Sequence, residues 1–209
     1  RLGKGIVLAK DTPNFIANRV GVHAMMAVIQ IMGEMDLTIE EIDAMTGPAI
    51  GRPKTATFKL ADLVGLDTFL HVADNIYPLI PDDEARETFV VPDVVRQMVA
   101  KGLLGRKSGA GFYKMTKTDA GKEVLTLNLE TLEFREKKSA KLPEIAVAKG
   151  IEDLPQRLKT LAFGKGKAGQ AIWKMLSATF SYSAMRLGEI CDQAADIDQA
   201  VCWGFNWDL

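Results

Sequence analysis

Apolar residues recur at helical spacing over residues 15–35, where they cover nearly two sides of the expected helix. Such a pattern is typical of a central and largely buried helix. Thr38 and Glu41 then fit the T-x-x-E capping box, in which two side chains satisfy backbone N–H groups at a helix start. The same periodicity, with glycine or proline at the ends, predicts further helices at residues 57–64, 67–76 and 92–102.

The pattern changes in the middle of the chain. Hydrophobic and polar residues alternate over residues 125–129 and again over residues 132–134. Alternation of period two on both sides of a turn-forming stretch predicts a β-hairpin with its turn near residues 128–131. A charged connector at residues 136–141 follows, and helical periodicity returns after residue 155. Near the start, the apolar run at residues 5–9 predicts the end of a buried strand.

The chain contains an internal repeat. A shift of 155 positions superposes residues 32–35 (MGEM) on residues 187–190 (LGEI) and, without a gap, Ile42-Asp43 on Ile197-Asp198. Both copies have a long apolar helix before the Gly-Glu pair and a short acidic helix after it, which favours a duplication. The expected division is a first helical unit at residues 1–115, a linker with the hairpin at residues 116–155, and a partial second unit at residues 156–209.

Composition narrows the classes of function. The hydrophobic share of 47% and the net charge of -1 fit an ordinary globular protein and give no reason to expect nucleic acid as a partner. No apolar run is long enough to predict a membrane span. Cys191 and Cys202 fit neither a disulfide framework nor a zinc site, which favours a cytoplasmic location. The chain begins with Arg1 and ends without a terminating signal, so we expect a fragment of a longer polypeptide.

Few residues in the sequence are candidates for catalysis or cofactor binding. Residues 164–169 fit the dinucleotide motif G-x-G-x-x-G, but the stretch before them has the periodicity of a helix and not of a buried strand. We therefore interpret this motif as a flexible entry to the next helix. His23 and His71 have no carboxylate one helical turn later and are expected to be packed residues, not general bases. Asn18 is open to two interpretations: a core or capping amide, or part of a functional site.

Four ordered blocks carry a family resemblance. They are residues 10–20 (KDTPNFIANRV), the short helix with Ile42-Asp43, residues 61–68 (ADLVGLDT) and residues 105–113 (GRKSGAGFY). Together they resemble the C-terminal domain of 3-hydroxyacyl-CoA dehydrogenases, and the part of the chain that ends in GFNWDL is similar to the degenerate second C-terminal domain of the large β-oxidation proteins. The resemblance implies an all-α fold with two 6-phosphogluconate-dehydrogenase-C-terminal-like helical units, the second truncated, joined by a linker with a short β-hairpin.

The resemblance also implies a division of roles. In the family, an N-terminal Rossmann domain binds NAD and supplies a His–Glu pair, and this domain is missing from the chain. The helical domain closes over acyl-CoA and contributes an Asn near the reacting oxygen. By motif position this catalytic residue is Asn18, while Gly51 and Pro53 lie where the family has a turn near the acyl chain. The chain has Gly-Arg-Pro-Lys at this turn in place of the commoner Met-Gly-Pro.

We therefore expect the chain to be the substrate-cleft and pseudo-dimerisation part of an NAD-dependent (S)-3-hydroxyacyl-CoA dehydrogenase of fatty-acid β-oxidation, inactive by itself. The expected partners are acyl-CoA, the chain's own Rossmann domain and, through the helical domains, further copies. No cofactor or metal is expected on the chain itself. Two alternatives remain open: the helical domain of another Rossmann-type dehydrogenase that acts on a small acid, and a non-catalytic helical interaction module.

Overall fold

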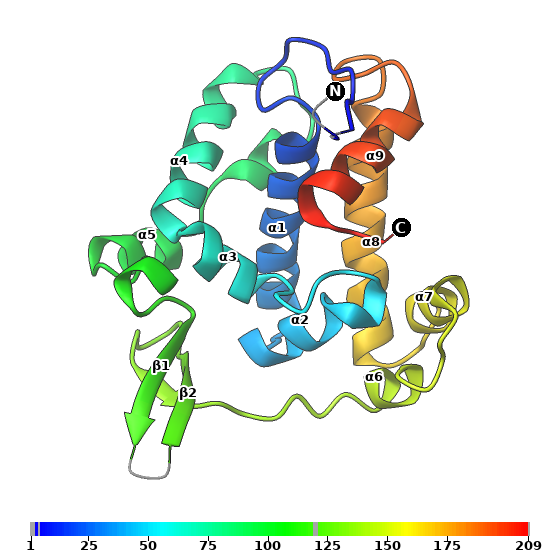
Figure 1. The fold of residues 1–209 in the computed structure, drawn as a ribbon. Helices are drawn as coiled ribbons and strands as arrows, with labels where there is room; N and C mark the ends of the chain where they lie inside the picture. Colours follow the sequence, from blue (N-terminus) through cyan, green and yellow to red (C-terminus); the bar gives the residue numbers. More distant parts are fainter. Residues whose placement is uncertain (1–2, 4, 119–120, 209) are drawn as a thin grey trace.

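The computed structural model describes residue 3, residues 5–118 and residues 121–208. Two long helices, α1 (Ala17–Glu34) and α8 (Lys167–Met185), pack against each other at the centre, and the other helices surround them (Figure 1). Most of the residues of α1 are buried, which confirms the predicted central helix.

Short helices follow α1 in the first half of the chain: α2 (Ile39–Met45), α3 (Phe58–Val64), α4 (Leu66–Ile76) and α5 (Asp93–Ala100). The predicted capping box opens α2, because the Thr38 hydroxyl accepts a bond from Glu41 N–H and the Glu41 carboxylate accepts one from Thr38 N–H. α3 ends at Gly65, whose φ of 98° is accessible to glycine at low cost. 3-10 turns lie at Pro48–Ile50 (η1), Tyr77–Leu79 (η2), Arg86–Phe89 (η3) and Arg106–Ser108 (η4).

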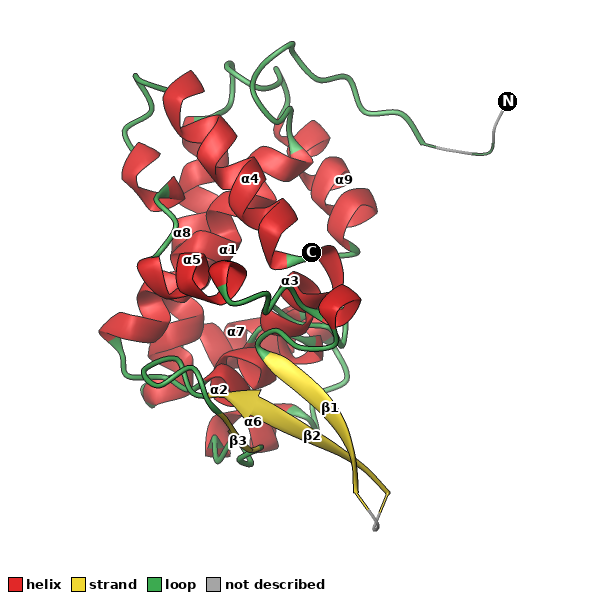
Figure 2. Ribbon diagram, turned by 90° about the vertical axis from the view of Figure 1, so that its left-hand side faces the viewer, coloured by secondary structure: helices red, strands yellow, loops and turns green. Residues whose placement is uncertain are grey.

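An antiparallel sheet occupies the middle of the chain, with β1 (Tyr113–Thr118), β2 (Gly121–Leu127) and β3 (Phe134–Glu136) in that order (Figure 2). The pairing of Leu127 with Phe134 confirms the predicted hairpin, and the Asn128 side chain accepts backbone N–H bonds within its turn. The sequence did not predict β1. Its residues YKMTKT lack a clear hydrophobic alternation, so its pairing with β2 becomes apparent only in the structure.

The second half contains α6 (Pro143–Ala148), α7 (Leu154–Ala162), α8 and α9 (Ala194–Phe205). α9 packs against the first turns of α1, and small residues allow this close approach. A Cβ added to Gly21 would lie 2.1 Å from the Phe205 ring, and one added to Gly204 would lie 3.1 Å from the Ala17 side chain.

Both halves of the chain contribute to one hydrophobic core, which includes Ile42, Phe58, Leu127, Ile172 and Tyr182. A smaller core cluster joins the start of α1 to α9 through Ile16, Val20, Val201 and Trp207. The all-α fold class with a short β-hairpin is confirmed. The division into two related units and the 155-position repeat remain predictions.

The predicted buried strand at residues 5–9 is wrong. This segment has no strand pairing, and Ile6 and Leu8 are 84% and 80% exposed. No neighbouring strand in the described part of the chain pairs with the segment, so Ile6 and Leu8 remain in solvent, whereas Val7 packs against the small core cluster at the start of α1. Its end is held at Lys10, whose backbone N–H donates to the Ile190 carbonyl oxygen at 2.9 Å.

Candidate functional site at the start of α1

Asn18 lies on the first turn of α1. Its side chain is exposed, and its amide group forms no hydrogen bond with any described residue. The interpretation of Asn18 as a core or capping amide is therefore wrong. The turn before it is bent, because Asn14 and Phe15 have φ angles of 64° and 52°. Non-glycine residues rarely adopt this left-handed conformation, and such residues gather at functional sites. The chain therefore presents an unpaired amide beside a strained helix entry.

Arg19, the next residue on the helix, is completely buried. Its guanidinium donates to the Tyr182 hydroxyl at 2.5 Å and to the Asp83 carboxylate at 2.6 Å. Tyr182 in turn donates to Asp83 at 2.7 Å. These contacts fasten the first turn of α1 to α8 and to the loop before η3.

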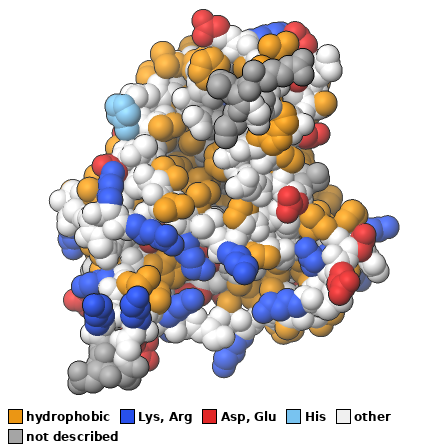
Figure 3. Space-filling model, viewed as in Figure 1, with side chains coloured by type: hydrophobic (Ala, Val, Ile, Leu, Met, Phe, Trp, Pro, Cys, Tyr) orange, Lys and Arg blue, Asp and Glu red, His pale blue; other side chains and the backbone are white. Residues whose placement is uncertain are grey.

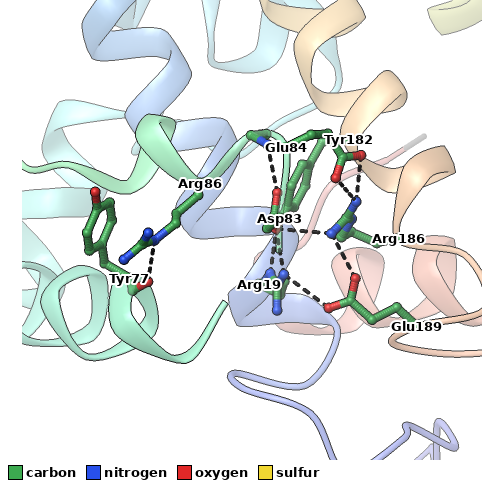
Figure 4. A network of polar contacts seen from close by, with 9 residues as sticks. Arg19, Tyr77, Asp83, Glu84, Arg86, Tyr182, Arg186 and Glu189 are labelled. Carbon is green, nitrogen blue, oxygen red and sulfur yellow. Dashed lines mark hydrogen bonds and ion pairs between the residues drawn. The ribbon is translucent and has the colours of Figure 1, made fainter. Parts of the chain in front are cut away.

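Further charged residues extend this network (Figure 4). Arg186 lies 3.2 Å from the Asp83 carboxylate and donates to Glu189 at 2.8 Å and to Glu84 at 2.6 Å. Glu189 also lies 3.1 Å from Arg19. Two arginines therefore share three carboxylates, so that most of the buried charge is neutralised within the network.

The pKa values of the network follow from burial and hydrogen bonding. Burial raises the pKa of Asp83, but the bonds from Tyr182 and Arg19 outweigh it and hold that pKa below the usual value. Burial and the bond to Asp83 raise the pKa of Tyr182, so its hydroxyl remains a donor. Burial lowers the pKa of His23 to about 4, and its neutral ring stacks on Tyr182 with 3.8 Å between centroids.

The sequence did not predict this buried network of Arg19, Asp83, Tyr182 and Arg186. Its one visible clue is Arg19 itself, a charged residue within the apolar stripe of α1 that requires a buried partner. Neither Asp83 nor Tyr182 carries a local pattern that identifies it as that partner, because they lie 64 and 163 positions away in the chain.

The other two predicted site residues lie in the turn that follows η1. Gly51 is buried with a φ of 71°, and its carbonyl oxygen accepts the Asp208 N–H at 2.7 Å. Pro53 is half-buried. Between them, Arg52 is buried under the Trp207 ring, 3.7 Å from its centroid, and burial lowers its pKa to about 10.

The segment at residues 205–208 connects this turn with the start of α1. Phe205 packs on Gly21 of α1, whereas Trp207 packs on Arg52. Among the described residues, no hydrogen bond joins Asn18 to Gly51 or to Pro53. The predicted site residues therefore lie on two elements, Asn18 on α1 and Gly51 and Pro53 in the turn after η1. Within the described chain no hydrogen bond joins them, but residues 205–208 pack against both elements.

The histidines have different environments. His23 is packed in the core as expected, although its Nδ1 atom finds no partner among the described residues. The packing expected for His71 is wrong, because the residue is exposed on α4, where its Nε2 atom lies 2.9 Å from the Asn75 amide. Within the described residues, neither ring forms a hydrogen bond or ion pair with a carboxylate that would orient it as a general base.

The glycine motif at residues 164–169 does not fit NAD. The helix α7, and not a strand, precedes it, as the periodicity predicted. A Cβ on Gly169 would lie 2.2 Å from the Gly164 carbonyl oxygen, so these glycines pack on each other and leave no open loop for a diphosphate. In the described ranges, none of the helices combines the length and apolar character needed to cross a bilayer, and His, Cys, Asp and Glu form no cluster of metal-binding size.

The fold is that of a helical domain with the unpaired Asn18 amide at the start of its central helix, and the described part contains no dinucleotide-binding fold. Comparison with known proteins identifies its family. Residues 15–115 match the model of the 3-hydroxyacyl-CoA dehydrogenase C-terminal domain. The chain belongs to the 3-hydroxyacyl-CoA dehydrogenase family, as the ordered sequence blocks predicted.

Curated relatives extend this match. A probable 3-hydroxyacyl-CoA dehydrogenase of Bacillus subtilis is 45% identical over 208 residues, which cover 100% of this chain and 26% of that protein. A probable 3-hydroxyacyl-CoA dehydrogenase of Deinococcus radiodurans is 50% identical over 118 residues, 56% of this chain and 33% of that protein. A putative fatty acid oxidation complex trifunctional enzyme of Rickettsia felis is 28% identical over 99% of this chain and 27% of its own length. The chain therefore spans about a quarter to a third of these relatives.

Among solved structures, 3-hydroxybutyryl-CoA dehydrogenase from Escherichia coli superposes with a TM-score of 0.60 over 98% of this chain and 53% of that chain. The sequence identity of 20% makes this a likeness of fold.

Proposed function

We propose that the chain forms the substrate side of an NAD-dependent (S)-3-hydroxyacyl-CoA dehydrogenase of fatty-acid β-oxidation. The family of residues 15–115 and the similarity to probable 3-hydroxyacyl-CoA dehydrogenases and to a putative fatty acid oxidation complex enzyme support this role. Because residues 164–169 do not fit a dinucleotide, the NAD-binding domain and the catalytic His–Glu pair belong outside this chain. By this proposal the chain is inactive when it is alone, and the whole enzyme works in the cytoplasm.

The exposed, unpaired amide of Asn18 is the observation that carries the proposal. A buried or internally bonded amide has no capacity to contact a substrate, whereas Asn18 has both its donor and its acceptor available. In the proposed enzyme this amide bonds either the substrate oxygen at C3 or the catalytic histidine of the other domain, and so fixes the geometry of proton transfer. The burial of Arg19 holds the helical turn in place behind it.

The turn with Gly51 and Pro53 is proposed to border the acyl chain. Pro53 offers the accessible surface of this turn, since Gly51 is buried beneath Asp208. The partial second unit at residues 156–209 is proposed as an internal pseudo-dimer partner. Its support is the packing of α8 against α1, the hydrogen bond that Arg19 donates to Tyr182 and the ion pair of Arg19 with Glu189.

The test measures NADH production from (S)-3-hydroxybutyryl-CoA by a polypeptide that joins this chain to a dinucleotide-binding domain. We expect Asn18→Ala to lower kcat tenfold or more, equivalent to about 1.4 kcal/mol of barrier. Asn75→Ala, which removes another exposed helical asparagine on α4, is the matched control and should leave kcat unchanged. Equal rates for the two variants would refute the role of Asn18, and an inactive parent enzyme would refute the dehydrogenase proposal.

A further inference from the structure

A cavity of about 460 Å³ opens between α3, η4 and the β1–β2 hairpin, away from Asn18. It is lined by Lys59, Asp62, Arg106, Gly109, Tyr113, Met115 and Val124. Its volume lies within the range of small-molecule sites. Neither the family blocks nor the proposed reaction assigns a ligand to it.

Two cationic side chains line this cavity, Lys59 and Arg106, and carboxylates of the described residues neutralise them only in part. Lys59 has one carboxylate, Asp43, at the long distance of 3.7 Å, and Arg106 has no carboxylate within ion-pair distance among the described residues. Figure 3 shows Lys and Arg side chains gathered around exposed hydrophobic side chains over this part of the molecule.

The hairpin adds two more cations to the same face. Met115 pairs with Val124, and both line the cavity, so strand alternation places the next pair on this face, Lys117 opposite Lys122. Like charges directly opposite each other destabilise an antiparallel pair. No carboxylate in the described part of the chain forms an ion pair with either lysine. A bound anion between them would remove this repulsion.

Asp62, which lines the cavity, and Asp43, the partner of Lys59, both accept hydrogen bonds from the protein. Asp62 accepts bonds from the backbone N–H groups of Phe112 and Tyr113, at 2.8 and 2.9 Å. Asp43 accepts the Phe58 N–H at 2.7 Å and the Tyr113 hydroxyl at 2.8 Å. Each oxygen of the two carboxylates therefore accepts a hydrogen bond from the protein, whereas Arg106 in the lining has no ion pair with a described residue.

The cavity also has an apolar wall. Met115 is 66% exposed and Val124 37% exposed, so the hairpin leaves hydrophobic surface open between the cations. A flat aromatic ring against Met115 and Val124 would cover this surface, while its phosphates reach the lysines and Arg106.

We propose that this cavity binds a nucleotide that carries two or more phosphates. The base lies against Met115 and Val124, and the phosphates lie among Lys59, Arg106, Lys117 and Lys122. The nucleotide end of acyl-CoA and a free nucleotide diphosphate share this chemistry. The assignment of the site to acyl-CoA rests on the proposed function, whereas the site itself rests on the cavity and its charges.

The experiment measures binding to the chain itself by titration calorimetry, independently of dehydrogenase activity. The probes are adenosine 3′,5′-bisphosphate, which has the 3′-phosphate and the first 5′-phosphate of the CoA nucleotide, together with ADP and inorganic pyrophosphate. We expect saturable binding of both nucleotides, weakened at least tenfold by Lys117→Gln/Lys122→Gln and by Arg106→Gln. The control Lys149→Gln/Lys165→Gln removes the same net charge from exposed positions elsewhere and should leave the Kd unchanged.

A variant of the apolar wall separates base recognition from charge. Met115→Ala should weaken both nucleotides several-fold and leave pyrophosphate unaffected. Tighter binding of adenosine 3′,5′-bisphosphate than of ADP assigns the site to CoA, and the reverse order assigns it to a free diphosphate. Absence of saturable nucleotide binding, equal losses in the control, or preference for a single-stranded oligonucleotide over the nucleotides would overturn the proposal.

Discussion

Asp83 is the residue on which the buried network depends most, since Arg19, Tyr182 and Arg186 all contact its carboxylate. Its other oxygen accepts the Ala85 N–H at 2.8 Å. Asp83→Ala removes every one of these contacts at once and leaves the completely buried Arg19 with only Tyr182 and Glu189.

The expected cost follows from this geometry. Removal of one partner from a buried ion pair costs about 3–5 kcal/mol, because the remaining charge stays buried without compensation. Most domains have a free energy of unfolding of only about 5–15 kcal/mol, so the loss is a large part of the total. Asp83→Asn keeps one acceptor oxygen, for either the Ala85 N–H or the Tyr182 hydroxyl, and should therefore cost less than Asp83→Ala.

Urea denaturation followed by tryptophan fluorescence and circular dichroism measures both variants. The matched control is Asp74→Ala, because Asp74 forms a two-bond pair with Arg96 that is largely exposed, and its loss should cost under about 1 kcal/mol. If Asp83→Ala destabilises the protein no more than Asp74→Ala does, the network does not hold α1 to α8. If Asp83→Ala fails to fold, the comparison of Asp83→Asn with Asp74→Asn provides the same test.

Two further predictions concern stability. The folded pKa of His23 is lowered to about 4 from 6.5, so its contribution to stability is present above pH 6.5 and is lost as the pH falls toward 4. At pH 5 the loss should be about 2 kcal/mol relative to pH 7.5, and His23→Gln should abolish that part of the pH dependence in urea titrations; an unchanged dependence would show that His23 does not titrate in this way. Gly111→Ala should lower the free energy of unfolding by about 1–3 kcal/mol, because its Cβ would lie 2.1 Å from the Asp62 carboxylate. Gly33→Ala, in an open position of α1, should instead be neutral or stabilising by up to about 1 kcal/mol, and equal effects in thermal denaturation would contradict this reasoning.

The sequence predicted those features that are encoded within a few residues. The apolar stripe of α1, the capping box of Thr38 and Glu41 and the alternation around the hairpin are all local, and the structure confirms each of them. The ordered blocks also identified the family correctly. The run at residues 5–9 shows the limit of such patterns, because hydrophobicity predicts burial only where another element is available to cover it.

The environment of the candidate site could not be predicted in this way. Whether Asn18 faces solvent depends on which side of α1 is covered by α8 and α9, and these helices lie more than a hundred residues away in the chain. The same is true of Gly51, which is buried by Asp208 although its own neighbours suggest an open turn. A single sequence does not show such distant contacts.

By itself, then, the sequence determined the helical class, the family and the identity of the candidate amide, because helix periodicity, caps and short motifs are properties of neighbouring residues. Only the tertiary structure decided that Asn18 is exposed, that Arg19 is neutralised by Asp83, and that Lys117 pairs with Lys122 on the hairpin face that carries Met115 and Val124. These outcomes depend on the packing of distant segments, since burial and pairing of charges are properties of the assembled fold.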